Sequence, residues 1–338
     1  MKRLKQKGAF LLELMIGLMM SSILIIGALT IFARFEGEKV TANQISETIS
    51  NGSLGLNYIE HMGKVAGFSL TDVNFLGCNV HFNNSENNIN SSFPLSPLII
   101  TTSNGSDSFS LFSGNSNNYF SSKNLISSPV NSEIQLKSTF SFTPGDIFIV
   151  GERSKECSLA QITSISNNDE KISYSTGSYT NNMGQNITTH FNDNGLYVNN
   201  YTSNAKLINL GKTPQIFNYS IENERLIEEN LINGEKNIIA ENIVRLKALY
   251  ALDTNRDGNV DSWSNVSPTG DNIRNIIGMK IAIIIRSPLK GKKCIVTTNK
   301  NFIWFGGEID ISDIEDWQCY RFRILESTIP FRNMLWQK

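Results

Sequence analysis

The sequence predicts an α+β protein: a long N-terminal helix, membrane-spanning in its first half, packed on a mainly antiparallel β head. Three observations support this prediction. An apolar run from Ala9 to Ala33 contains a single charged residue. Apolar residues then continue at helical spacing as far as Met62. From Glu133 onward, short β-branched and aromatic runs alternate with turn-forming residues.

The apolar run is long enough to cross a bilayer. At 1.5 Å per residue, the segment from Ala9 to Ala33 forms a helix of roughly 37 Å, which spans the hydrocarbon core with some tilt. Four basic residues precede it: Lys2, Arg3, Lys5 and Lys7. Because basic residues stay on the cytoplasmic side, we expect a cytoplasmic N-terminus and a head outside the inner membrane.

Three interpretations of this segment compete. A cleaved secretory signal has a shorter apolar core and a small-x-small cleavage site, and neither is found before Arg34. A plain membrane anchor fits the length but leaves Glu13 unexplained, since a carboxylate in a membrane span is costly and usually functional. Thirdly, Gly8 followed five residues later by Glu13 resembles the class III leader of type IV pilins and type II secretion pseudopilins. Ala9 departs from that pattern, in which Phe is commonest.

The leader resemblance implies specific processing and assembly roles. A prepilin peptidase would cleave between Gly8 and Ala9, remove residues 1–8, and leave an N-methylated Ala9 at the start of a retained helix. Glu13 would pair with the N-terminal amine of a neighbouring subunit in the filament core. A misplaced subunit would leave this buried charge unpaired, so the pair would select the register of assembly.

Composition places the chain among ordinary globular proteins. It has 338 residues, 40% hydrophobic and 18% charged, with a formal net charge of -1, so charge gives no reason to expect nucleic-acid binding.

Four cysteines outside the inner membrane predict disulfides. Cys294 and Cys319 flank one predicted hairpin, which favours their pairing and that of Cys78 with Cys157. Free buried cysteines are the alternative.

Residues 34–65 form the predicted amphipathic second half of the helix, although Gly52 and Gly55 weaken the pattern. A separate short helix after a break is the alternative. Residues 66–338 form the head. Within it, the Asn/Ser-rich insertion 79–134 is expected to be loops, interrupted by short strands at Leu98–Ile100 and Phe109–Phe112.

The remaining head is expected to be mostly β-strands. The strongest are Ile243–Leu252 and Ile276–Arg286, and Leu226–Glu228 follows Asn223–Glu224 as a hairpin return. The other predicted strands are Asp146–Val150, Ser158–Ile165, Ile172–Tyr174, Leu196–Val198, Lys206–Leu210, Ile216–Ile221, Phe302–Phe305 and Tyr320–Leu325.

Several further segments resemble the PilW family of minor pilins. They are Asn51-Gly52, Ala66–Phe68, Gly77-Cys78, Gly145–Ile147, Tyr250–Asp253 and Arg321–Asn333. The resemblance implies a minor pilin of the initiating complex, which becomes the pilus tip. The implied partners are other minor pilins, the major pilin, the prepilin peptidase, the inner-membrane platform protein and a tip adhesin. Adhesion, twitching motility and DNA uptake are the processes that such a pilus serves, and the sequence does not choose among them.

An acidic loop suggests calcium. The hard oxygen ligands fall at alternate positions of a tight loop: Asp253, Asn255, Asp257, Asn259 through its carbonyl, and Asp261. Gly258 permits the turn, but Ser264 stands where an EF-hand has its bidentate glutamate. The alternative is a solvated turn, in which Asp, Asn and Gly are favoured without any metal.

No catalytic motif is found: GxSxG, HExxH and the phosphate loop are absent from the sequence. We therefore expect no enzyme, and no cofactor other than Ca²⁺. Two other functions stay open. One is a type II secretion pseudopilin, and the other is a membrane-anchored calcium-binding adhesin that does not polymerise.

Overall fold

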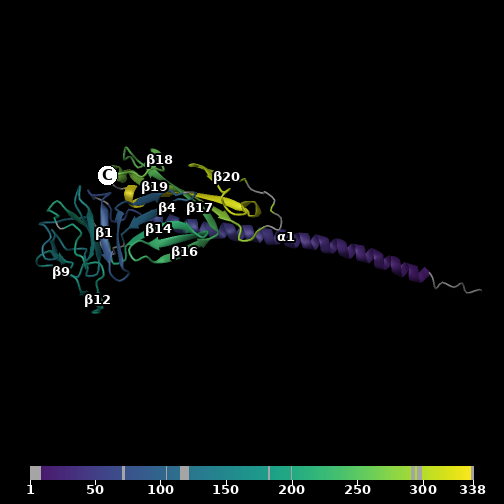
Figure 1. The fold of residues 1–338 in the computed structure, drawn as a ribbon, viewed down its shortest axis with the longest axis horizontal. Helices are drawn as coiled ribbons and strands as arrows, with labels where there is room; N and C mark the ends of the chain where they lie inside the picture. Colours follow the sequence, from purple (N-terminus) through teal and green to yellow (C-terminus); the bar gives the residue numbers. More distant parts are fainter. Residues whose placement is uncertain are drawn as a thin grey trace, which may run out of the picture.

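A single long helix dominates the molecule and extends far beyond the head (Figure 1). The computed structural model describes residues 9–70, 73–103, 105–114, 122–181, 183–198, 200–290, 294 and 299–335. Helix α1 (Ala9–Val65) runs without interruption for 57 residues, roughly 85 Å. Only its second half packs on the head, where it contacts strands β16, β19 and β22.

Three larger sheets build the described head. The six-stranded sheet has the order β2-β1-β8-β7-β13-β5 and consists of β1 (Asn79–Asn84), β2 (Ile89–Pro94), β5 (Lys123–Asn124), β7 (Ile147–Gly151), β8 (Cys157–Gln161) and β13 (Lys206–Gly211). The five-stranded sheet has the order β16-β15-β14-β4-β3 and consists of β3 (Leu98–Thr101), β4 (Ser108–Ser113), β14 (Gln215–Glu222), β15 (Arg225–Asn230) and β16 (Lys236–Glu241). The four-stranded sheet has the order β18-β17-β19-β22 and consists of β17 (Ile243–Leu252), β18 (Ser262–Ser264), β19 (Ile276–Arg286) and β22 (Phe322–Pro330).

Smaller elements complete the described head. A three-stranded sheet has the order β6-β10-β9 and consists of β6 (Glu133–Gln135), β9 (Ser164–Ser166) and β10 (Lys171–Ser173). Two ribbons are formed by β11 (Ser178–Thr180) with β12 (Asn186–Thr188) and by β20 (Asn301–Trp304) with β21 (Gly307–Asp310). The other elements are the 3₁₀ turns η1 (Gly270–Asn275) and η2 (Trp317–Cys319) and the short helix α2 (Arg332–Leu335). Among the strand pairs of the described residues, β1 and β8 alone are parallel. The predicted fold class, an apolar N-terminal helix followed by a mainly antiparallel β head, is therefore confirmed.

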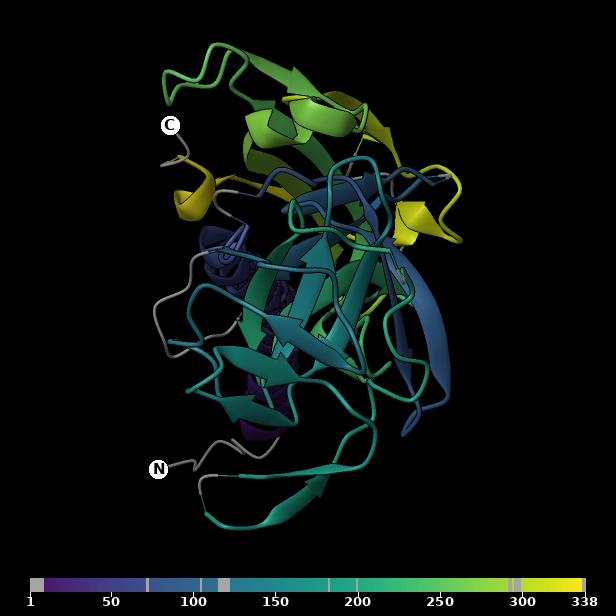
Figure 2. The same ribbon diagram turned by 90° about the vertical axis from the view of Figure 1, so that its left-hand side faces the viewer.

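The core next to the helix positions the candidate site. Leu56, Ile59 and Met62 of α1 pack between the five-stranded and four-stranded sheets, and this cluster includes Tyr219 and Ile281. Figure 2 looks toward the distal end of the head, with the helix behind the sheets. Two further clusters cover the faces of the six-stranded sheet, farther from the helix. Burial of one apolar stripe of α1 therefore joins the helix to the head.

A fourth cluster lies on the other face of the four-stranded sheet, beneath the β20-β21 ribbon. It contains Trp304, Cys319 and Phe322. This ribbon lies on the same side of the head as the exposed part of α1 (Figure 1).

Two local predictions are wrong. The Asn/Ser-rich segment is not all loop at its start, because β1 and β2 form a hairpin there. Its few apolar residues recur with period two, so Val80, Phe82 and Phe93 are buried although Asn and Ser surround them. Leu196–Val198 is not a strand, although Leu196 is buried. A three-residue apolar run does not distinguish a strand from a buried loop.

The other predicted strands are found, with one change: the segment Ser158–Ile165 is divided between β8 and β9. Asn223 and Glu224 form the expected tight hairpin turn, and both have positive φ, 49° and 61°. The domain boundaries at 8, 33, 65 and 79–134 stay predictions.

Candidate functional site: the exposed helix and its junction with the head

The first half of α1 is an apolar surface without a partner in the described chain. The segment Phe10–Glu36 has a mean hydropathy of 2.3 and, by length and composition, could cross a membrane. None of this segment is buried, and Leu24 for example is 73% exposed. A contiguous apolar surface of this size requires lipid or other helices around it. The segment is therefore a candidate membrane anchor.

The predicted assembly residue lies within this surface. Glu13 is exposed on α1, in the second helical turn. Ala9 is the first residue of α1. Gly8 and the leader residues 1–7 lie outside the described residues, so the cleavage site stays a prediction, as do the methylation of Ala9 and the role of Glu13.

Glycines allow the second half of α1 to approach the sheets closely. A Cβ added at Gly63 would lie 2.6 Å from the γ2 methyl of Ile329, and one at Gly55 would lie 2.9 Å from Cβ of Ala240. A Cβ at Gly52 would similarly meet Ile285. These contacts are shorter than real Cβ contacts, so the helix lies closer to the sheets than a larger residue permits. The glycines that weaken the helical pattern thus serve the packing of the helix.

Polar contacts add to this junction. The hydroxyl of Ser327 on β22 donates to Oε1 of Glu60 at 2.5 Å. The side-chain amide of Asn333 donates to the carbonyl oxygen of Val65 at 3.0 Å, at the last residue of the helix. The same carbonyl also accepts the backbone N–H of Phe68 at 3.2 Å, so two donors outside the helix satisfy this carbonyl at its end. The end of α1 is held both by its side chains and by its backbone.

A buried carboxylate lies beneath the helix. Glu228 on β15 is 3% exposed, and the hydroxyl of Tyr219 donates to its Oε2 at 2.7 Å. Tyr58 of α1 also hydrogen-bonds to Glu228. Burial and the hydrogen bond to Glu228 raise the pKa of Tyr58 to about 12, and burial together with Glu228 raises the pKa of Tyr219 even further. Both hydroxyls therefore stay protonated as donors over the whole neutral range.

The acidic loop is closed by its own hydrogen bonds. Asp253 is 3% exposed, and its carboxylate accepts the backbone N–H groups of Arg256, Asp257 and Gly258 at 2.6, 3.2 and 2.8 Å. Asp261 accepts the backbone N–H and the hydroxyl of Thr254, both at 2.7 Å.

The side chains of Asn255 and Asp257 are also engaged within the loop. The Oδ1 atom of Asn255 accepts from the N–H of Asp257, whose Oδ1 in turn accepts from the N–H of Asn259. In the described part of the chain, no three acidic, His or Cys side chains come together as a group that could hold a metal. The loop thus brings the five predicted ligands into one turn, and calcium binding there stays a prediction.

Both predicted disulfides are present. Cys78 joins Cys157 with a Cα–Cα distance of 5.8 Å, and so ties the segment before β1 to β8. Cys294 joins Cys319 with a Cα–Cα distance of 4.1 Å, and so encloses the β20-β21 ribbon. The pairing inferred from the flanked hairpin is therefore confirmed.

The comparison with protein families assigns the C-terminal part of the head. Residues 197–333 match the family described as Type IV Pilus-assembly protein W, PilW. This part of the chain is PilW-like. The match covers strands β13 to β22. It includes the acidic loop and the strands β16, β19 and β22, which contact the helix. No curated protein and no solved structure matches the chain.

The PilW match includes two of the segments on which the resemblance was based, Tyr250–Asp253 and Arg321–Asn333. The segments Asn51-Gly52, Ala66–Phe68, Gly77-Cys78 and Gly145–Ile147 lie outside it. The match supports a role in type IV pilus assembly, and with it an interaction with other pilus components.

Sequence reasoning missed two features of the junction. The sequence does not show that Gly63 contacts β22. Three glycines in one helix, Gly52, Gly55 and Gly63, could nevertheless have suggested that the helix packs closely on a neighbour. The Tyr58–Glu228–Tyr219 group was missed because its members are far apart in the sequence. The strand β15 gives no periodic signal for it either, because Leu226, Ile227 and Glu228 are buried in succession and Glu228 is followed by a second glutamate.

Proposed function

We propose that this chain is a minor pilin of a type IV pilus, part of the initiating complex that becomes the pilus tip. It acts by subunit packing and not by catalysis. The observation that carries the proposal is the combination of a fully exposed apolar span, bearing one internal carboxylate, with a PilW-like head fixed to the same helix. An apolar helix that can exchange lipid for neighbouring helices is what filament assembly from a membrane requires.

The proposed sequence of events follows from this architecture. The helix holds the chain in the inner membrane, with its head on the periplasmic side, while the prepilin peptidase removes residues 1–8. The span then leaves the lipid and enters the filament core. There Glu13 pairs with the N-terminal amine of Ala9, its own or that of a neighbour, and the head contacts other pilins laterally. Because the close helix–sheet contacts join the two parts, a force on the helix moves the head with it.

The first test examines processing. The chain is purified from membranes of cells that contain the prepilin peptidase, and its mass and N-terminal sequence are measured. We expect a chain that begins at N-methylated Ala9. An intact Met1 would instead indicate an ordinary anchored protein, and a start beyond Ala33 would indicate a secreted one.

The second test examines assembly. We expect the Glu13→Ala variant to be processed normally but to enter pili poorly, because the amine of the neighbour then has no carboxylate partner. Glu36→Ala, at the other end of the same exposed span, is the matched control and should assemble normally. Normal piliation of cells with Glu13→Ala would contradict the proposal.

Deletion of the gene separates the pilus from the alternative functions. We expect loss of surface pili with normal exoprotein secretion. The opposite result would identify a type II secretion pseudopilin. If both pili and secretion are normal, the remaining candidate is the membrane-anchored adhesin that does not polymerise.

A further inference from the structure

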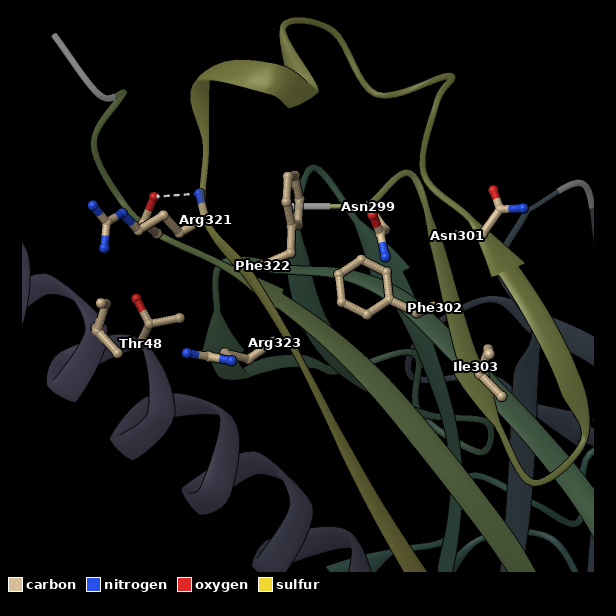
Figure 3. A pocket seen from close by; sticks show the side chains of 10 residues that line it. Thr48, Asn299, Asn301, Phe302, Ile303, Arg321, Phe322 and Arg323 are labelled. Carbon is tan, nitrogen blue, oxygen red and sulfur yellow. Dashed lines mark hydrogen bonds between the residues drawn. The ribbon is translucent and has the colours of Figure 1, made fainter. Parts of the chain in front are cut away.

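A groove of about 520 Å³ lies between α1 and the C-terminal part of the head. One side is formed by Ile45 and Thr48 of the helix, and the other by the β20-β21 ribbon and the start of β22 (Figure 3). Its volume is within the range of ordinary ligand sites. The groove lies beyond the exposed span, at the beginning of the helix segment that packs on the head.

The inner wall of the groove is aromatic. The rings of Phe302 and Phe322 face each other edge-on, with centroids 6.4 Å apart at 63°. Phe322 is buried, whereas Ile303 on the rim is 77% exposed. Ile45 adds an apolar side chain from the helix. The partly exposed Phe302 and Ile45 and the exposed Ile303 offer an apolar contact to an occupant, because exposed apolar surface gains free energy on burial.

Two arginines give the groove a positive charge. Arg321 and Arg323 both line it, and Figure 3 shows the Arg323 guanidinium pointing toward α1. The backbone N–H of Arg321 donates to the hydroxyl of Ser287 at 3.2 Å, which fixes the start of β22.

Other arginines of the same sheet are paired: Arg245 contacts Asp313, and Arg286 contacts Glu224. In the described part of the chain, neither Arg321 nor Arg323 has a carboxylate within ion-pair distance. The groove therefore presents two guanidinium groups that this chain leaves without an anionic partner.

We infer that the groove is a docking site for an acidic segment of a neighbouring pilus subunit. Carboxylates of the partner bind Arg321 and Arg323, and an apolar side chain of the same segment rests on Phe302 and Ile303. Guanidinium groups bind carboxylates through paired hydrogen bonds, and arginine and aromatic residues are enriched at the centres of interfaces. Residues of α1 line the groove, and a neighbouring subunit lies beside this helix if the chain assembles into a pilus, so this inference rests on the proposed function.

Photo-crosslinking in living cells tests the contact with the full-length protein. The photoreactive residue p-benzoylphenylalanine replaces Ile303 on the rim of the groove. The same residue replaces Val266 in a control chain, since Val266 is 71% exposed on the loop after β18. In piliated cells we expect position 303, and not position 266, to crosslink to another pilus subunit. A chain that crosslinks to no pilus subunit at position 303 would overturn the inference.

Charge reversal tests the chemistry of the contact. We expect the double variant Arg321→Glu, Arg323→Glu to reduce the crosslink at position 303 at least about tenfold, because partner carboxylates then face like charges. Lys137→Glu with Lys212→Glu changes the net charge equally at exposed positions outside the groove, and should leave the crosslink unchanged. Arg321→Lys with Arg323→Lys should retain most of it. Equal crosslinking by both charge-reversal variants would contradict an acidic partner.

Piliation distinguishes failure of this inference from failure of the proposed function. If deletion of the gene leaves pili unchanged, the proposed function fails. If deletion removes pili but the Arg321→Glu, Arg323→Glu chain restores them fully, the proposed function stands and the docking site is wrong. Suppressors of the charge-reversal defect that replace an acidic residue of another pilus subunit by a basic one would support the site.

Discussion

Glu228 shows how one residue couples the helix to the head. Its carboxylate is buried, and its described hydrogen-bond donors are the hydroxyls of Tyr58 and Tyr219. An unpaired buried carboxylate is costly, and two neutral donors satisfy it without an ion pair. Because Tyr58 belongs to α1 and Glu228 to β15, this group responds to separation of the helix from the sheet.

This group predicts a loss of stability at high pH. The pKa of Tyr58 is raised from 10.0 to about 12 in the folded chain. Its stabilising contribution is therefore complete below about pH 10 and is lost as the pH rises toward about 12. We expect the full-length chain in detergent to unfold at lower urea concentration at about pH 11.5 than at about pH 9.

The Tyr58→Phe variant should lose less stability over the same interval, because it has no hydroxyl to ionise there. Part of the pH dependence remains through Tyr219. The difference in stability between the Tyr58→Phe variant and the original chain should be modest, since Tyr58 is 36% exposed to solvent. An identical loss in the variant and the original chain would exclude Tyr58 as its source.

The acidic loop gives a second prediction at this scale. Binding of Ca²⁺ requires Asp253, Asp257 and Asp261 to give up part of their internal hydrogen bonds and converge on the ion. We therefore expect weak binding, with a dissociation constant on the order of 10⁻³ M. Calorimetry on the full-length chain should show heat that is absent from Asp257→Ala. No heat from the original chain at millimolar calcium would exclude the site.

At the scale of elements, the helix–sheet distance is set by glycine. Gly52, Gly55 and Gly63 each face a sheet residue that leaves no room for a Cβ. The cost in helix propensity is about 1 kcal/mol per glycine, and tight packing of the helix between two sheets offsets it.

This arrangement predicts the effect of enlarging one glycine. Gly63→Ala gains helix propensity but forces its methyl against Ile329, so we expect a net loss of about 1 kcal/mol or more in the free energy of unfolding of the head. Gly27→Ala, with nothing within 4 Å, gains the same propensity without a clash and should not destabilise. Chemical denaturation of both chains in detergent makes the comparison. A Gly63→Ala chain as stable as Gly27→Ala would show that the contact is loose.

At the scale of the whole molecule, the disulfides constrain the head at two places. The Cys78–Cys157 bond spans 79 residues and the Cys294–Cys319 bond spans 25 residues. By loop-closure entropy they contribute about 4.5 and about 3.5 kcal/mol, respectively. The first ties the segment before β1 to β8, and the second holds the ribbon that forms one wall of the groove.

Replacing the two cysteines of each disulfide by serine tests how much each bond stabilises the head. We expect Cys78→Ser with Cys157→Ser to lower the free energy of unfolding by about 2–5 kcal/mol, and Cys294→Ser with Cys319→Ser by somewhat less. The second variant should also weaken crosslinking at position 303, because the ribbon then loses its covalent tie. An equal free energy of unfolding for the oxidised and the reduced chain would contradict both stability expectations.

Local patterns predicted much of the fold. The bounds of β17 and β19 agree with the sequence prediction, because apolar residues largely alternate along β17 and isoleucine, a strong strand former, dominates β19. The hairpin of β1 and β2 was missed because Asn and Ser outweigh the alternation of Val80 and Phe82 in composition. The division of β8 from β9 depends on which neighbours each strand finds, and the local sequence does not contain that information.

The sequence by itself determined the apolar span, the isolated Glu13 and the helix–head order, because each follows from local periodicity or spacing. It favoured one pairing of the cysteines, and the structure decided between that pairing and free cysteines. The tertiary structure alone decided which residues meet across the junction. Tyr58 with Glu228, Gly63 with Ile329, and Arg323 with the helix are separated by long stretches of chain, and the packing of sheets against α1 brings them together. Contacts of this kind depend on the whole fold, so a local pattern does not identify both partners.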